Sequence, residues 1–360
     1  MNALAQRIAT LIETSGAISV AEYMAMCLFD PTDGYYTTRE PFGVKGDFTT
    51  APEVSQMFGE LVAVWLFAAW RASGNPLPCT FAEIGPGRGT LMKDIMRSLA
   101  RLDKRIVDEA SFALVEASPR LTRIQVETLA DAPAVVSWHE TVETLPPLPL
   151  FIVGNELFDA IPIRQFVKMP EGWRERLVAL DDDRKLRFVA GLNSLDPSLL
   201  PSDAAAAPEG AIVELAPARG ATMASIAAPI AQRGGAGLFF DYGYLEPGIG
   251  DTLQAMRRHA YADVLAEPGE ADLTAHVDFA GIAASAQSHG LVAHTATQGD
   301  FLLGMGLLER AGALGAGFDD AGRERVRSEV ERLAGEDQMG RLFKVLAIVP
   351  RGVAVPGFSS

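Results

Sequence analysis

Gly85, Gly87 and Gly89 stand at alternate positions directly after the apolar run 80–84, and a helical pattern follows them. A strand, a glycine turn and a helix in that order let bare backbone approach a ligand at the N-terminus of the helix. We therefore expect a nucleotide-like ligand at this turn, held by the three glycines and by Pro86.

The spacing of the glycines separates two classes of nucleotide-binding turn. A dinucleotide-binding turn requires a third glycine at position 90, where this chain has Thr90. The form present here is acid-x-Gly-x-Gly-x-Gly, with Glu83 as the acid, and it is typical of class I methyltransferases. A nicotinamide-dependent dehydrogenase is therefore disfavoured. Glu83 could face the methionyl amino group of the cofactor, face water, or cap the neighbouring helix.

A second acid follows at the spacing that such a fold requires. The next apolar strand runs into Glu116, Ala117 and Ser118. In α/β nucleotide folds, an acid at the end of the second strand accepts hydrogen bonds from the ribose hydroxyls. We expect these three residues to bind the ribose of the cofactor. The alternative is that the glycines only make a tight turn and that Glu116 is a solvated strand end.

Along the chain, short apolar runs alternate with helical segments, which is typical of βαβ units and a parallel sheet. These elements must position the glycine turn and the acids. The expected strands are 80–84, 112–115, 134–138, 150–153 and 237–240. We expect a helical N-terminal cap with a lid loop over residues 1–75, a core over 76–350 and a tail over 351–360. Insertions into this core are expected at about residues 164–210, 242–277 and 297–340, and the first of these should begin with an antiparallel β-meander. Residues 202–210, rich in Ala and Pro, are the best candidate for a mobile connection.

Composition excludes several function classes. The chain has 360 residues, of which 48% are hydrophobic, and a formal net charge of −15. A surface this acidic disfavours nucleic acid and anionic membranes as partners, and no stretch is long enough to span a bilayer. Cys27 and Cys79 lie far apart and outside any metal-binding or redox motif, which fits a reducing compartment. We expect a cytoplasmic protein; a homodimer is an open alternative to a monomer.

The chain resembles the MidA-like family, whose mitochondrial members are arginine methyltransferases needed for assembly of respiratory complex I. The matching stretches are residues 23–28, 34–36, 46–53, 83–90, 155–162, 250–254, 272–279 and 340–346. The resemblance implies a seven-stranded class I (Rossmann-like) core, S-adenosylmethionine as the cofactor, and an arginine in a protein substrate as the methyl acceptor. A respiratory complex I subunit is the expected client. The alternatives are methyl transfer to a small molecule or RNA, and an assembly chaperone that binds the cofactor without turnover.

An arginine acceptor requires carboxylates, because its guanidinium is always protonated and its lone pairs are delocalised. Carboxylates that grip two nitrogens would leave the third more nucleophilic. The expected catalytic residues follow the fourth strand, at the carboxyl edge where open α/β sheets bind ligands. Glu156 is the first clamp, Asn155 a polar positioner, and Asp159 a second clamp or a helix cap.

Three further groups complete the expected site. In the lid loop 46–53, Phe48 and Thr50 are candidates for contacting the cofactor, and Asp47 for contacting the cofactor or the substrate. An N-cap for the next helix, with Phe48 buried in the core, would also explain the pattern. Glu214 and Tyr242 are candidates for binding the acceptor, with salt bridging and aromatic packing as the alternatives. We expect no metal, because the spacing of the histidines and acids lacks a convincing ligand set.

Overall fold

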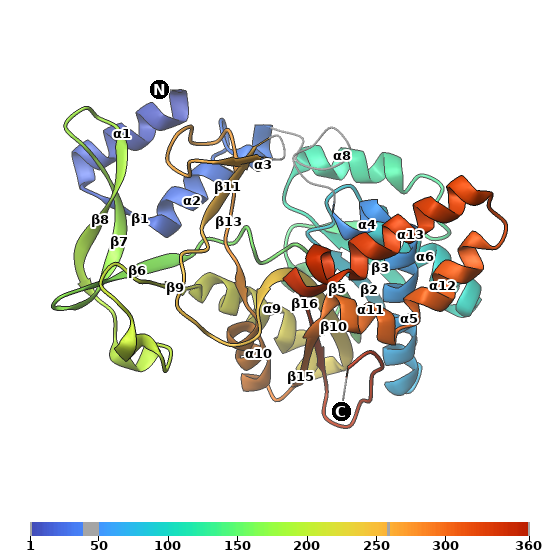
Figure 1. Cartoon of the computed structure of the whole chain (residues 1–360). Helices are drawn as coiled ribbons and strands as arrows, with labels where there is room; N and C mark the ends of the chain where they lie inside the picture. Colours follow the sequence, from blue (N-terminus) through green and yellow to red (C-terminus); the bar gives the residue numbers. More distant parts are fainter. Residues whose placement is uncertain (1, 39–49, 258–259, 359–360) are drawn as a thin grey trace. The chain divides into compact units, whose positions relative to one another are not determined.

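The computed structural model describes residues 2–38, 50–257 and 260–358. The chain gathers into two compact units, and most of their elements are labelled in Figure 1. The first unit comprises Met1–Phe48, Phe158–Gly220 and Glu246–Asp278, and the second comprises Thr49–Leu157, Ala221–Leu245 and Phe279–Ser360. Because the first unit combines the N-terminal residues with two of the expected insertions, it is a discontinuous body built from three stretches of chain.

The second unit contains the class I sheet. Seven strands follow one another in the order β15-β16-β10-β5-β2-β3-β4. Strands β4, β3, β2, β5 and β10 pair in parallel, whereas β16 is antiparallel to both β10 and β15. The predicted fold class is therefore confirmed. The strand bounds are β2 Thr80–Ile84, β3 Ser111–Val115, β4 Val136–His139, β5 Leu150–Asn155, β10 Gly235–Tyr244, β15 Val292–Thr297 and β16 Phe343–Val349.

Helix α5 (Gln56–Ala72) and helix α6 (Thr90–Leu102) pack against each other and share one hydrophobic cluster with the sheet. Their backbones come close where Gly59 meets Asp94, since a Cβ built on Gly59 would lie 2.6 Å from the Cβ of Asp94. The sequence placed α5 in the N-terminal cap, within residues 1–75. Its packing instead makes it part of the second unit, because its apolar residues lie on nearly every side and find partners only in the large core.

The remaining helices of the second unit complete its layers and its insertion. Helix α10 contacts β10, β15 and β16. Between β15 and β16, three helices and a final irregular turn form the helical insertion that the sequence placed at 297–340. The bounds are α4 Ala51–Val54, α7 Lys104–Glu109, α8 Pro119–Thr128, α9 Pro217–Arg233, α10 Phe279–Ser288, α11 Gln298–Gly304, α12 Leu307–Gly315 and α13 Asp320–Ala334. The first residues of α9 fall in the other unit.

The first unit is built on a small antiparallel sheet in the order β1-β7-β6-β9, with β8 paired to β7. The predicted meander is confirmed, since β6, β7 and β8 pair in antiparallel succession. The bounds are α1 Ala3–Ser15, β1 Ile18–Ser19, α2 Val20–Phe29, α3 Tyr35–Thr38, β6 Arg164–Met169, β7 Gly172–Leu180, β8 Leu186–Ser194, β9 Ile212–Leu215, β11 Gln254–Arg257, β12 Ala260–Ala262, β13 Asp272–Thr274 and β14 Val277–Asp278. One apolar cluster joins α1 and α2 to these strands.

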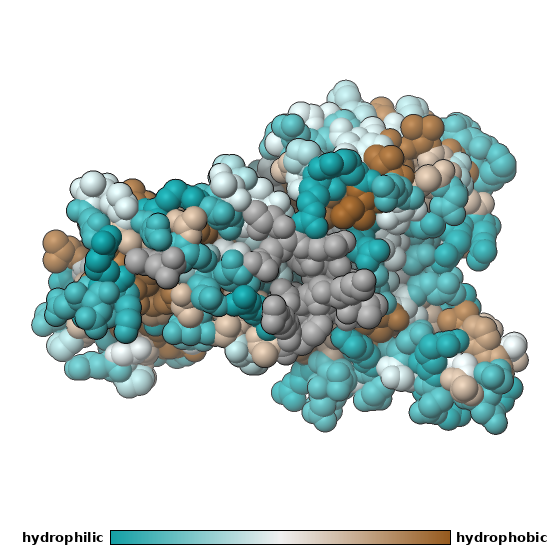
Figure 2. Space-filling model, turned by 90° about the horizontal axis from the view of Figure 1, so that it is seen from above, coloured by the Kyte–Doolittle hydropathy of each residue, from teal (hydrophilic) through white to brown (hydrophobic). Residues whose placement is uncertain are grey.

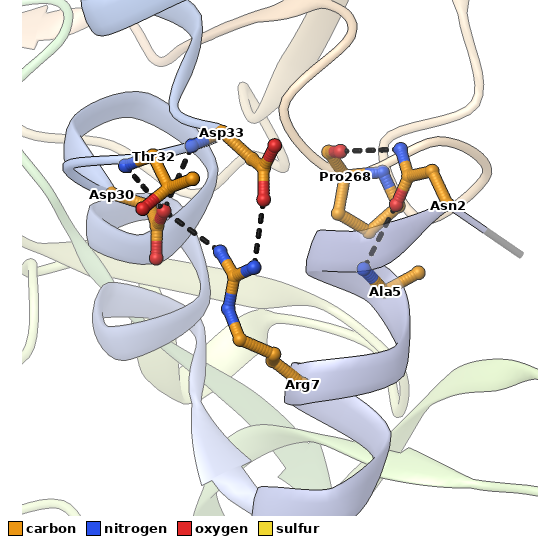
Figure 3. Close-up of polar contacts among 7 residues, drawn as sticks. All are labelled: Asn2, Ala5, Arg7, Asp30, Thr32, Asp33 and Pro268. Carbon is orange, nitrogen blue, oxygen red and sulfur yellow. Dashed lines mark hydrogen bonds and ion pairs between the residues drawn. The ribbon is translucent and has the colours of Figure 1, made fainter.

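Polar contacts tie the N-terminal helix into the first unit (Figure 3). Asn2 caps α1 by accepting a hydrogen bond from the Ala5 amide, and its own amide donates to the carbonyl of Pro268. Arg7 forms ion pairs of 2.7 Å with both Asp30 and Asp33, where α2 ends. The start of α1 and the end of α2 are thereby joined.

The segment expected to be a mobile connection, 202–210, contains a 3₁₀ turn at Ala204–Ala206. The ammonium group of Lys168 donates hydrogen bonds to three carbonyls there, at 2.7 to 3.3 Å. This segment is therefore fastened to β6.

On the face drawn in Figure 2, hydrophobic residues form separate small patches in a hydrophilic surface. Within the described parts of the chain, no helix has the length and apolarity needed to cross a bilayer.

Candidate functional site

The glycine turn between β2 and α6 has the backbone that its sequence predicts. Gly85, Gly87 and Gly89 have φ values of 65°, 51° and 82°, all in the left-handed region that favours glycine. Gly89 is the N-cap of α6, and its amide donates a 2.7 Å hydrogen bond to the carbonyl of Pro86. A Cβ on Gly85 would lie 3.2 Å from Leu157. The turn therefore requires glycine for its conformation, and it presents the N-terminus of α6 to a ligand.

Glu83 is the buried acid in front of this turn. Its residue is 3% exposed, and its Oε2 has no hydrogen-bond partner among the described residues. Burial raises the pKa of Glu83 well above its usual range, Glu116 raises it further, and a hydrogen bond from the amide of Met92 opposes the rise. An acid buried at this cost calls for a cationic or hydrogen-bond-donating partner.

A second unsatisfied acceptor lies on the same face of the sheet. Glu83 pairs in register with Val153 of the neighbouring strand β5, so Asn155 projects from that strand on the same side, two residues further along. The Oδ1 of Asn155 is buried and lacks a hydrogen-bond partner within the described residues. Two buried oxygen acceptors beside a glycine turn suit a ligand ammonium group, which carries only donors. The ammonium of the expected cofactor fits these residues.

Glu116, the predicted ribose acid, follows β3. Its Oε1 accepts a 2.7 Å hydrogen bond from the amide of Ser118, and its Oε2 accepts one of 3.1 Å from Gln125. Ser118 is also the N-cap of α8, and with Ala117 it lies in the short connection between β3 and α8. Burial raises the pKa of Glu116, and these hydrogen bonds oppose the rise. The carboxylate is thus held in one orientation, with further lone pairs available to hydroxyl donors.

Glu156 has an unusual backbone at the carboxyl end of β5. Its φ is 52°, a left-handed conformation that costs a non-glycine residue about 1 to 2 kcal/mol. Its amide donates a 2.8 Å hydrogen bond to the carbonyl of Phe240, and the side-chain amide of Asn155 donates one of 3.1 Å to its Oε1. Strained residues of this kind cluster at functional sites. The side-chain amide of Asn155 and the carboxylate of Glu156 therefore meet at this end of β5, and their catalytic roles stay predictions.

Asp159 lies in the first unit, in a turn rather than at the start of a helix. The helix-cap alternative for this residue is wrong, because no helix begins in the turn after β5. Its carbonyl accepts hydrogen bonds from Arg219 and from the amide of Ala275, both at 3.1 Å. Its role as a second clamp stays a prediction.

Arg219, which is 2% exposed, was not among the residues predicted from the sequence. Its guanidinium donates to the carbonyls of Asp159, Ala275 and His276 at 2.6 to 3.1 Å. These carbonyls belong to two segments far apart in the sequence, within 155–162 and 272–279. No local sequence pattern marks this residue, because its burial is seen only in the structure, where the guanidinium must find acceptors.

The carboxylate of Glu214 in β9 accepts three hydrogen bonds within the first unit. Its carboxylate accepts hydrogen bonds from Gln165 at 2.8 Å and from both the amide and the hydroxyl of Thr252, at 2.9 and 2.5 Å. Burial raises its pKa, and the hydrogen bonds from Thr252 and Gln165 oppose the rise. These contacts supply a structural reason for the acid. Its contact with an acceptor stays a prediction.

The remaining predicted site residues are Tyr242 and the three residues of the lid loop. Tyr242 in β10 is 8% exposed, and its ring meets that of Phe343 edge-on at 5.6 Å. Thr50 is the N-cap residue of α4, without a side-chain capping hydrogen bond. Asp47 and Phe48 lie outside the described residues.

Across 2–38, 50–257 and 260–358, no three His, Cys, Asp or Glu side chains gather as a metal site would require.

Comparisons with known proteins show what the chain resembles. Residues 61–297 match a family model described as an S-adenosyl-L-methionine-dependent methyltransferase. The rat protein arginine methyltransferase NDUFAF7, mitochondrial, is 36% identical over 94% of this chain and 82% of its own length. Its human counterpart is 35% identical over 94% of this chain and 81% of its own length. The likeness thus extends over both units.

A solved structure adds the ligand. A protein of Burkholderia thailandensis, crystallised with S-adenosyl-homocysteine, is 30% identical and has a TM-score of 0.82 over 98% of this chain and 92% of its own. A second crystal structure from the same organism gives a TM-score of 0.80 at 31% identity, over 98% of this chain and 92% of that one. The architecture of the whole chain is therefore shared with a protein that binds the demethylated cofactor.

Proposed function

We propose that this chain, which belongs to the family of S-adenosyl-L-methionine-dependent methyltransferases, methylates an arginine side chain in a protein, with a respiratory complex I subunit as the client. The observation that carries the proposal is its likeness, at 35% identity and over 94% of its length, to a protein named as a protein arginine methyltransferase. The charge of the chain agrees with it, since a net charge of −15 favours a basic segment as substrate.

The cofactor is S-adenosylmethionine, which supplies a methyl carbon bonded to a positively charged sulfur. The residues proposed to hold it are the glycine turn, Glu83 and Asn155 for the methionyl ammonium, and Glu116 for the ribose. Transfer is an in-line displacement without a metal, so the protein's task is to align the acceptor nitrogen and exclude water.

Glu156 is proposed to grip the acceptor guanidinium. A carboxylate binds two guanidinium nitrogens in parallel, which localises positive charge there and leaves the third nitrogen more nucleophilic. The side-chain amide of Asn155, 3.1 Å from Glu156 Oε1, orients this carboxylate. Its left-handed backbone supports the proposal, because a strained conformation without a function is costly to keep. Asp159 is proposed as the second clamp, and Glu214 and Tyr242 as residues near the acceptor.

The test uses complex I subunits isolated from cells that lack this protein. The purified chain and methyl-labelled cofactor are added, and methylated residues are identified by mass spectrometry. We expect methylarginine with the wild type and none with Glu156→Gln, while calorimetry finds S-adenosylhomocysteine binding unchanged in the variant. Glu140→Gln, an exposed acid that follows β4 at the same edge of the sheet, is the matched control.

Other outcomes would replace the proposal. Methylation of RNA or of a small molecule, with none on protein, would assign a different acceptor. Restored complex I assembly in cells that produce only Glu156→Gln would favour a chaperone, because the variant retains the cofactor but not turnover. Full activity of Glu156→Gln would remove this residue from the reaction.

A cytoplasmic location is part of the proposal. Cys27 and Cys79 are both buried free thiols, and burial raises the pKa of each to about 12. Free thiols suit a reducing compartment. Cell fractionation with an antibody to the chain tests the location, and light scattering of the same preparation tests the homodimer that the sequence leaves open.

A further inference from the structure

Gln125 of helix α8 contacts three segments of the second unit. Its side chain is fully buried, at 0% exposure. Its Nε2 donates hydrogen bonds of 2.8 Å to the carbonyl of Gly87 and 3.1 Å to Oε2 of Glu116, and its Oε1 accepts one of 3.0 Å from the indole of Trp138. The side-chain amide of Gln125 therefore contacts the glycine turn, the end of β3 and strand β4.

The chemistry of the three partners fixes the orientation of this amide. An indole N–H only donates and a backbone carbonyl only accepts, so the oxygen must face Trp138 and the nitrogen must face Gly87. Both amide hydrogens are then used, one on Gly87 and one on Glu116. A side chain with neither donor would leave the Gly87 carbonyl and one oxygen of Glu116 without these partners.

The arrangement determines how Glu116 can bind a diol. Ser118 donates to one oxygen and Gln125 to the other, so the carboxylate is held in one orientation while it keeps acceptor capacity for ribose hydroxyls. Gln125 also donates to the carbonyl of Gly87 in the glycine turn. Glu116 and the turn are therefore held in fixed positions relative to each other.

We infer that Gln125 is a positioning residue for the cofactor, which acts through Glu116 and Gly87 to set recognition of the ribose hydroxyls. The inference rests on the proposed role of Glu116 as the ribose acceptor. Simple filling of the core does not explain the residue, because methionine would fill a similar volume without burying an amide. The amide is placed where both of its donors reach ligand-binding segments.

The test measures selectivity rather than affinity alone. Calorimetry compares S-adenosylhomocysteine with an analogue in which hydrogen replaces both ribose hydroxyls, for wild type, Gln125→Met, Glu116→Gln and the double variant. The matched control is Gln298→Met, another glutamine at 0% exposure in the second unit, which donates a 2.8 Å hydrogen bond to the carbonyl of Leu333. That substitution is expected to lower stability without changing the preference for the hydroxyls.

We expect Gln125→Met to reduce this preference by about tenfold, the effect of losing one hydrogen bond to a charged group. The double variant is expected to be no less selective than Glu116→Gln, because both changes act on one carboxylate. A second variant, Gln125→Glu, retains the acceptor for Trp138 but loses both donors, and it is expected to lose selectivity as well.

Two results would overturn the inference. Wild-type selectivity in Gln125→Met and Gln125→Glu would reduce Gln125 to a core residue. Wild-type selectivity in Glu116→Gln would remove the ribose role of Glu116 and the inference with it. Both results leave methyl transfer to arginine standing, since that activity is measured separately on the client protein.

Discussion

The hydroxyl of Thr90 donates a 2.6 Å hydrogen bond to Oε1 of Glu53. Thr90 is the first residue of α6, at the position where a dinucleotide-binding turn carries its third glycine. Glycine has no hydroxyl, so the departure from the dinucleotide pattern creates the contact that ties helix α4 to the start of α6. Glu53 belongs to the stretch 46–53 that the sequence analysis singled out as a lid.

Replacement of Thr90 by Val tests this contact. Valine keeps the shape of the side chain but leaves the Glu53 carboxylate without its donor, which should lower the free energy of unfolding by about 1 to 3 kcal/mol. Urea denaturation measures the loss, and Thr90→Ser, which keeps a hydroxyl, should lie within about 1 kcal/mol of the wild type. Equal stabilities for Thr90→Val and the wild type would show that the contact contributes nothing.

Gly87→Val is expected to abolish binding of S-adenosylhomocysteine. A β-branched residue is strained at the φ of 51° found here, and its side chain would occupy space beside the turn. Gly210→Val is the matched control, because Gly210 has a φ of 83° and nothing within 4 Å of a built Cβ, but lies in the first unit. Calorimetry on both variants separates ligand contact from backbone strain; equal binding by the two would assign the glycine turn to packing.

Much of the second unit could be predicted from local pattern. The strand at 80–84, the turn and α6 are contiguous, and each has its own signal in apolar runs and glycine spacing. The positions of Glu116 and Glu156 at the carboxyl ends of β3 and β5 were also predictable, because each follows an apolar run in the sequence; their roles stay predictions.

Contacts between residues far apart in the sequence could not be predicted from local sequence pattern. Gln125 and Arg219 are single polar residues on helices, and nothing near them in the sequence reveals that they meet Gly87 and Asp159. The unit that α5 joins is a related case. Helical periodicity predicts that α5 forms, but only its packing decides which core it joins; its nearly continuous apolar run, 61–70, was the available hint.

Glu156→Gly should separate stability from activity. Glycine removes the cost of a φ of 52°, which should offset its larger loss of backbone entropy on folding, so the free energy of unfolding should stay within about 1 kcal/mol of the wild type. Methyl transfer should be lost, because the carboxylate is gone. Arg184→Gly, at a φ of 60° in a turn of the first unit, controls for the backbone effect. A large loss of stability on Glu156→Gly would instead show that the Glu156 side chain supports the fold.

Asp94 should make stability depend on pH in the direction opposite to most paired acids. It is 6% exposed, and burial raises its pKa to about 6, against the attraction of Arg97 at 2.9 Å. Glu60 and Glu53 also raise this pKa, while Lys93 lowers it.

A raised folded-state pKa means that the fold favours the protonated acid. The stability that Asp94 contributes is therefore full below pH 4 and is lost as the pH rises through 6. Asp94→Asn cannot ionise, so relative to the wild type it should gain roughly 2 to 3 kcal/mol between pH 4 and pH 8, at about 1.4 kcal/mol per pKa unit. Urea denaturation at the two pH values measures the gain, and Asp108→Asn, in an exposed pair with Lys104, should show little of it. A gain of opposite sign would mean that Arg97, and not burial, controls the ionisation of Asp94.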